Sequence, residues 1–331
     1  MENQSLNYMR ESTRNFINFH RRKHKNECSD IHRPLEDIGI TSEIIAQISN
    51  KLHTKSSISA KELKILKNGF MNPKNVEIFL HVHGALRGLI RELTCSDIKK
   101  QCISAGCVCN LSLGDSGSCS IIAKAGGPYL NASLDNLTVE LAVNCAWALG
   151  NLAGSDVKVC KILVTQGALN KLCKVYTNED IQNAALYALL HFVYQLRDEL
   201  RPEHLQEILQ TITELDITMS SSRILFILSC HENFPEHISE QLLQKILINV
   251  TSLIESQQNC KQEWDCELVY LIRTLANSGR FDYILNYLSV NGMSLKQLLD
   301  ASNPISESVL WLLGNMYNYC SDREIFCKVI N

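Results

Sequence analysis

The sequence predicts an all-helical solenoid, and three observations support this prediction. Apolar residues recur three and four positions apart through most of the 331-residue chain, which is the spacing of helices with one buried face. Glycine and proline are scarce, at 15 and 6 residues. A short pattern of aromatic, glycine and asparagine residues returns about every 40 residues, which is typical of helical repeat proteins.

The clearest copy of this pattern is VELAVNCAWALGNLAG, residues 139–154. Trp147 and Asn151 stand four residues apart, so they share one face of the predicted helix. Gly154 is a natural helix end. An indole and a primary amide side by side on one helix face indicate that something docks there.

Three weaker copies follow the same order of residues. The steps from Asn110 to Asn151 and from Asn151 to His191 are about 41 and 40 residues, a period typical of HEAT or armadillo solenoids. A second marker, HGAL at 83–86, GGPY at 126–129 and QGAL at 166–169, precedes these helices and predicts a turn at each. The residues in the tryptophan and asparagine positions of the weaker copies are Gly106 and Asn110, Tyr187 and His191, and Trp311 and Asn315.

Composition narrows the class of protein. The chain is 45% hydrophobic and 20% charged with a net charge of -3, which is enough for a core buried one repeat at a time. We find no apolar run of about 18 residues and no secretory signal. The 14 cysteines therefore indicate reduced core residues of a cytoplasmic or nuclear protein. The spacing of Cys107 and Cys109 does not favour zinc.

The elements are predicted in chain order as follows. Residues 1–35 form a basic arm, either a lone helix or disordered in isolation. Residues 36–331 form the solenoid, which opens with helices at 41–50 and 60–69, capped by Ser42 and Ser59. Asn72-Pro73 predicts a break before the first good repeat. The clearest repeats span 79–196, with helices at 85–94, 98–114, 118–125, 138–154, 157–166, 168–176 and 181–196. After a break at Arg201-Pro202, degenerate repeats span 203–331, with helices at 205–215, 220–230, 239–256, 264–277, 281–290, 295–301 and 306–319.

The marker GA-x-x-x-L, followed by a helix that ends W-A-L-G-N-x-A-G, resembles the armadillo repeats of importin-alpha, the nuclear import adaptor. The likeness is clearest over residues 79–195. It implies an armadillo-type α-solenoid, a right-handed superhelix of three-helix repeats whose third helices line a concave groove. Short, divergent members of the family, including the transmembrane and coiled-coil domain group, have similarly eroded repeats.

The resemblance also implies a peptide-binding groove. Asparagine amides clamp the backbone of an extended peptide, indole rings form walls for lysine and arginine stems, and acidic residues select basic peptides. The residues that it implies for peptide binding are Asn110, Gly114, Trp147, Asn151, Asp156, Tyr187, His191, Trp311 and Asn315.

The lysine pocket of the family is only partly kept. Gly114 matches its glycine, but Cys119 stands in place of its threonine. Ser155 stands in place of its aspartate, with Asp156 one residue later. Helix packing is the alternative interpretation of Trp147 and Trp311, because buried tryptophan is common.

The arm contains FHRRKHKNECSDIHR, which is similar in layout to the importin-beta-binding segment of the family. The alternative is a solvated basic tail or a nuclear localisation patch. The residues implied for importin-beta binding are Arg21, Arg22, Lys23, Lys25 and Arg33.

These features together predict a nuclear import adaptor, cytoplasmic and nuclear, that binds basic cargo peptides in the groove and an importin-beta-like receptor through the arm. The alternative is a non-transport armadillo scaffold. We expect no enzyme, cofactor, metal, nucleic acid or membrane partner, because no phosphate loop, metal-ligand spacing or nucleophile motif occurs.

Overall fold

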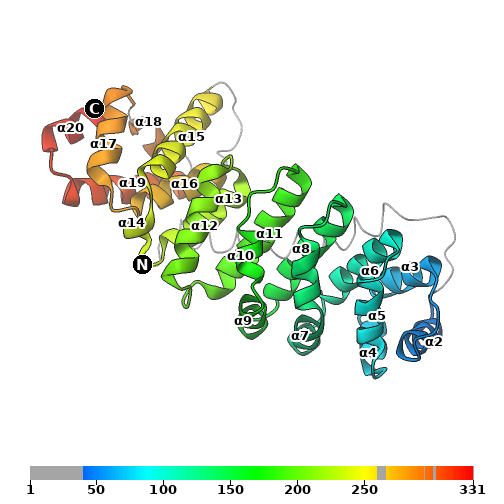
Figure 1. Ribbon diagram of the computed structural model, residues 1–331. Helices are drawn as coiled ribbons and strands as arrows, with labels where there is room; N and C mark the ends of the chain where they lie inside the picture. The colour runs from blue at the N-terminus through cyan, green and yellow to red at the C-terminus, as the bar shows by residue number, and fades with distance from the viewer. Residues whose placement is uncertain (1–39, 259–265, 294, 301–302, 331) are drawn as a thin grey trace. The chain divides into compact units, whose positions relative to one another are not determined.

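The computed structural model describes residues 40–258, 266–293, 295–300 and 303–330. These residues form helices joined by short connections, and no strand occurs among them (Figure 1). The helices fall into two compact units, one that ends at Leu196 and one that begins at Arg197. The predicted basic arm, with Arg21, Arg22, Lys23, Lys25 and Arg33, lies outside the described residues.

The first unit has two layers of helices. In the inner layer, each of the helices α3, α6, α8 and α11 packs on the next, and in the outer layer α2, α5, α7 and α9 do the same. Apolar side chains such as Leu89 and Leu149 fill the space between the layers and are fully buried. The helices of this unit are α2 (Ser42–His53), α3 (Ala60–Gly69), α4 (Pro73–His81), α5 (Ala85–Leu93), α6 (Ile98–Leu111), α7 (Ser116–Ser133), α8 (Val139–Ala153), α9 (Val157–Thr165), α10 (Ala168–Leu172) and α11 (Glu179–Leu196).

The second unit repeats the same construction. Helices α13, α16 and α19 pack in sequence, while α12 and α15, and later α17 and α20, pack beside them. The sequence did not predict the short helix α14 or the last helix α20. The helices of this unit are α12 (Pro202–Glu214), α13 (Met219–Ser229), α14 (Phe234–His237), α15 (Glu240–Gln258), α16 (Cys266–Ala276), α17 (Phe281–Val290), α18 (Lys296–Leu299), α19 (Asn303–Tyr319) and α20 (Arg323–Ile330).

Polar side chains define where the first helices begin. Ser59 caps α3 as predicted, in a reciprocal capping box with Glu62. The predicted cap at Ser42 is wrong: Thr41 caps α2, and the Ser42 hydroxyl instead donates to Asn75. The break predicted at Asn72-Pro73 is confirmed, since α3 ends at Gly69 and α4 begins at Pro73. Asn72 caps α4, and proline at the first helical position loses no intrahelical hydrogen bond.

Two of the three predicted marker turns are confirmed, and the third is wrong. Gly84 and Gly167 adopt left-handed φ values of 84° and 81° just before α5 and α10. The GGPY marker at 126–129 lies instead inside the continuous helix α7. Gln166 lies against this stretch, since a Cβ at Gly127 would stand 1.9 Å from its Oε1, and its amide donates to the Ala123 carbonyl. Gln166 therefore bonds the helix at the carbonyl next to that of Lys124, which loses its helical donor at Pro128.

Glycine allows α8 and α11 to approach closely. A Cβ at Gly150 would lie 2.9 Å from the Ala188 Cα, and a Cβ at Gly154 would lie 2.4 Å from the His191 Nδ1. No flexible chain end can yield at Ala188, because the contact is with backbone. The glycine of the Leu-Gly-Asn pattern therefore serves packing between inner helices.

We predict that Gly150→Ala destabilises the protein by about 1–3 kcal/mol, because the added methyl overpacks the contact between α8 and α11. Gly314→Ala is the matched control, since Gly314 holds the same place in the pattern but has nothing within 4 Å of its Cβ position. Alanine there should be neutral or stabilising by up to about 1 kcal/mol. Urea unfolding gives the free energy of unfolding of both variants. An equal loss of stability in the two would contradict the packing role of Gly150.

Candidate functional site

The repeated asparagines join neighbouring inner helices. The last carbonyls of a helix have no partner within it, and each of these asparagines donates to such a carbonyl on the preceding inner helix. Two of these bonds lie in the first unit and one in the second, and we call them the amide seam. They run from Asn110 Nδ2 to the Lys67 carbonyl (2.8 Å), from Asn151 Nδ2 to the Cys109 carbonyl (3.4 Å) and from Asn315 Nδ2 to the Ala276 carbonyl (2.8 Å).

A fourth amide extends the seam where the pattern has histidine. The Gln195 Nε2 on α11 donates to the Gly154 carbonyl at 3.1 Å, and this bond is equivalent to those that the asparagines of α6 and α8 make. Sequence reasoning missed Gln195 because it placed His191 in the asparagine position. The available signal was an amide one helical turn after His191, on the same face.

The structure brings Asn151, Tyr187 and His191 together. The Tyr187 hydroxyl donates to Asn151 Oδ1 at 2.7 Å, and the Tyr187 ring meets His191 edge-on at 4.6 Å between ring centroids. Asn151 is 1% exposed, and Tyr187 and His191 are also buried. Both ends of the Asn151 amide are therefore engaged within the protein.

Trp147 and Asp156 are the more accessible members of the predicted site in the first unit. Trp147 is half-buried, one turn before Asn151 on α8. Asp156 is also half-buried and caps α9 by accepting from the Lys158 N–H at 2.8 Å. This bond, and a second from the Ser116 hydroxyl at 2.9 Å, lower the pKa of Asp156, so its carboxylate stays charged at neutral pH.

The remnant of the lysine pocket lies at the end of α6. Gly114 is half-buried, and a Cβ there would stand 3.2 Å from the Leu111 carbonyl. The thiol of Cys119, in the place of the family's threonine, is buried and donates to the Ser112 carbonyl at 3.4 Å. Cys119 therefore belongs to the core beside the pocket.

The predicted residues of the second unit differ in exposure. Trp311 is 48% exposed on α19, and the guanidinium carbon of Arg273 lies 5.2 Å from its ring centroid. Asn315 is half-buried and takes part in the amide seam. The Trp311 ring therefore already has a cation on one face.

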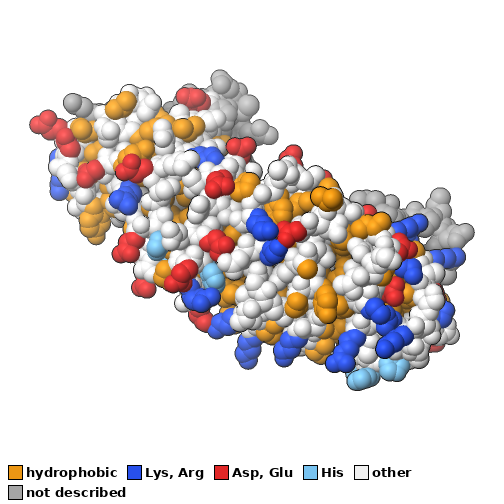
Figure 2. All heavy atoms as spheres, in the orientation of Figure 1, with side chains coloured by type: hydrophobic (Ala, Val, Ile, Leu, Met, Phe, Trp, Pro, Cys, Tyr) orange, Lys and Arg blue, Asp and Glu red, His pale blue; other side chains and the backbone are white. Residues whose placement is uncertain are grey.

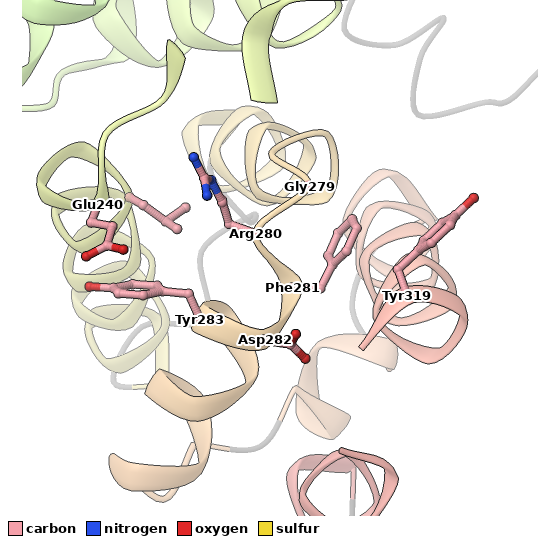
Figure 3. Close-up of a pocket in the computed structure, with 8 residues that line it drawn as sticks. Glu240, Gly279, Arg280, Phe281, Asp282, Tyr283 and Tyr319 are labelled. Carbon is pink, nitrogen blue, oxygen red and sulfur yellow. The ribbon is translucent and has the colours of Figure 1, made fainter. Parts of the chain in front are cut away.

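A separate hollow of about 510 Å³ lies in the second unit, at the turn between α16 and α17 (Figure 3). The Phe281 and Tyr319 rings stack on one side of it, 5.9 Å apart, and Glu240 and Tyr283 lie on the other. Asp282 accepts from the Ser321 N–H and hydroxyl, which ties α17 to the end of α19. No residue of the predicted peptide site lines this hollow.

The outer layer of the first unit is basic on one face. Figure 2 shows lysine and arginine side chains gathered over α4 and α5 and along α7 and α9. Such a face repels a basic peptide, so it does not compete with the inner layer for that ligand.

In the ranges that the structure describes, no three histidine, cysteine, aspartate or glutamate side chains cluster as metal ligands. Among the described helices, none is both long and apolar enough to cross a bilayer.

Comparisons with known proteins agree with this fold. No protein-family profile matches the chain. A 91-residue stretch is 31% identical to the probable importin subunit alpha-A of Dictyostelium discoideum, and it covers 27% of this chain but only 16% of that protein. An engineered protein of known structure superposes with a TM-score of 0.66 at 19% identity, over 82% of this chain and 68% of its own. A designed armadillo repeat protein superposes with a TM-score of 0.53 at 18% identity, over 71% of this chain and 99% of its own. The chain therefore has an all-helical, armadillo-type solenoid fold, and the predicted resemblance to armadillo repeats is confirmed.

We predict that Asn151→Ala lowers the free energy of unfolding by about 1–3 kcal/mol, because it leaves the Cys109 carbonyl and the Tyr187 hydroxyl without their partner in a buried place. Asn318→Ala is the control, since Asn318 is an exposed asparagine on α19. Its effect should stay within about 0.5 kcal/mol. Urea unfolding compares the two, and an Asn151→Ala protein as stable as the control would show that the seam does not hold the helices together.

Proposed function

We propose that the protein binds an extended basic peptide along the inner layer of its first unit, with Trp147 at the centre. The observation that carries this proposal is the position of Trp147: a half-buried indole on an inner helix, one turn from a buried asparagine. The exposed part of this indole can attract a lysine or arginine of the ligand.

Charge and geometry assign the roles in this proposal. Asp156 supplies a carboxylate that favours a basic ligand, and Trp147 supplies the wall. Asn151 primarily holds α8 in place, because Tyr187 and Cys109 engage its amide. The proposed set in the first unit is Asn110, Gly114, Trp147, Asn151, Asp156, Tyr187 and His191. Trp311 and Asn315, which the sequence predicted with them, lie in the second unit.

The finer proposal is an importin-alpha-like adaptor in nuclear import. Support comes from the WALGNLAG pattern and from the short match to a probable importin subunit alpha. In this proposal the groove takes the localisation signal of a basic cargo protein. The arm, through Arg21, Arg22, Lys23, Lys25 and Arg33, takes an importin-beta-like receptor, and the protein moves between cytoplasm and nucleus.

A non-transport scaffold is the second candidate, and one observation favours it. The bond from Tyr187 to Asn151 Oδ1 occupies an amide that would otherwise accept from a peptide backbone. The inner layer would then hold a partner protein through side-chain contacts at Trp147, with less dependence on a backbone clamp.

We predict that Trp147→Ala weakens the binding of a basic signal peptide by about 1–2 kcal/mol, because the peptide loses a cation–π contact at a partly desolvated wall. The matched control is Tyr129→Ala, which removes an exposed aromatic ring from α7 in the outer layer. Fluorescence anisotropy gives the affinities, and thermal melts show whether each variant is folded. If Trp147→Ala binds as tightly as the Tyr129→Ala control, Trp147 is a packing residue and the proposed site is wrong.

We also predict that importin-beta binds the full chain with an affinity that falls steeply with salt, because salt screens the attraction between the lysines and arginines of the arm and an acidic partner. Alanine at Arg21, Arg22, Lys23 and Lys25 together should abolish this binding without changing peptide affinity. Isothermal titration calorimetry at low and physiological ionic strength measures both. Binding that ignores salt, or no binding at all, would remove the adaptor proposal and leave the peptide scaffold.

A further inference from the structure

The aromatic positions of the second unit are already covered by arginines of the chain itself. Arg273 of α16 places its guanidinium carbon 5.2 Å from the Trp311 ring centroid, and Arg223 of α13 lies 5.6 Å from the ring of Tyr270. Tyr270 and Trp311 are one repeat apart, on successive inner helices. In both cases the arginine comes from the preceding inner helix. The arrangement is therefore repeated and not a single chance contact.

These arginines are buried parts of the fold. Arg223 and Arg273 are 6% and 4% exposed. Burial lowers the pKa of Arg273, and the Glu307 carboxylate on α19 opposes this. A guanidinium keeps its charge in proteins, so Arg273 is a fixed positive charge beside Trp311. A buried charge with a partner is costly to displace, because its neighbours would lose their pairing.

In the first unit a lysine occupies the corresponding place, beside a glycine in the tryptophan position. A Cβ at Gly106 would lie 2.9 Å from the Cε of Lys67 and 3.3 Å from its Nζ. Gly106 holds the tryptophan position of its repeat, so the Lys67 stem fills the space that a larger side chain would occupy. Lys67 lies on α3, the preceding inner helix, as Arg223 and Arg273 do in the second unit.

We infer that Arg273 is a resident cation that closes the partly exposed Trp311 ring to the lysines and arginines of a ligand. Arg223 lies in the same way over the fully buried Tyr270 ring, and Lys67 fills the space beside Gly106. Arg273 then determines specificity: it excludes a cationic side chain from Trp311 by covering one ring face and by repelling a second positive charge. Trp311 and Asn315 consequently drop out of the peptide site, and a basic peptide engages the Trp147 region. The statement about peptides rests on the proposed function, whereas the statement about Trp311 does not.

The test reads Trp311 directly with a small probe. Trp147→Phe and Trp264→Phe leave Trp311 as the single tryptophan, and argininamide is the guanidinium-bearing probe. With Arg273 present, we expect no saturable change in Trp311 fluorescence. With Arg273→Met, which keeps an unbranched apolar stem, we expect a saturable change in Trp311 fluorescence. Its midpoint should lie at an argininamide concentration at least fivefold below the highest concentration that leaves the Arg273 protein unchanged. Arg280→Met, at an exposed arginine of the same unit, is the control and should behave as the unsubstituted protein.

A second titration separates this inference from the proposed function. An octapeptide of alternating lysine and arginine is titrated into Trp147→Ala, with and without Arg273→Met. We expect Arg273→Met to increase peptide affinity at least threefold in this background. If the peptide does not bind the unsubstituted protein at all, the proposed function fails, yet the argininamide result still decides the role of Arg273.

The inference is overturned if argininamide changes Trp311 fluorescence to the same extent with and without Arg273. Arg273→Gln is the second variant, and circular dichroism shows whether either variant is folded. If neither variant folds, the test is made on the protein that keeps Arg273 and has Trp311 as its single tryptophan. The quenching of Trp311 fluorescence by added acrylamide or caesium then decides whether Arg273 covers the ring. A ring beside a fixed cation should be quenched by neutral acrylamide and hardly by caesium, and efficient caesium quenching would overturn the inference.

Discussion

A side-chain amide that reaches a helix-terminal carbonyl on its neighbour is the interaction on which the inner layers depend. A helix leaves its last carbonyls without intrahelical partners, and a buried carbonyl without a partner is costly. Asn110, Asn151 and Asn315 satisfy such carbonyls one repeat back. The same bonds set the register between successive inner helices. Between α8 and α11 the amide bond is that of Gln195 to the Gly154 carbonyl, and in that register Gly150 lies close to Ala188.

The fold could be predicted from the sequence because a period of about 40 residues repeats several local signals together. The errors came where tertiary contacts outweigh local preference. The proline in α7 predicted a turn, but Gln166, from a segment about 40 residues later, hydrogen-bonds the helix there. Helices α14 and α20 are short, and little in their composition distinguishes them from connections.

The candidate site could be predicted only as a set of residues. The pattern correctly brings Asn151, Tyr187 and His191 together, since a repeat places equivalent positions on neighbouring helices. The pattern could not show which partner each polar group has, because the sequence gives the type of each residue and not the direction in which its side chain points. Packing decides whether an asparagine faces a ligand or a neighbouring helix. Packing also decides which cation covers Trp311.

The exchange rates of the asparagine side-chain amides with solvent test the amide seam most directly. Nuclear magnetic resonance of protein labelled with ¹⁵N-asparagine resolves these NH₂ groups, and Asn318 provides an exposed reference. If the seam holds the inner helices together, the hydrogen-bonded amide protons of Asn110, Asn151 and Asn315 should exchange at least tenfold more slowly than those of Asn318. Exchange of the Asn151 amide as fast as that of Asn318 would contradict the seam.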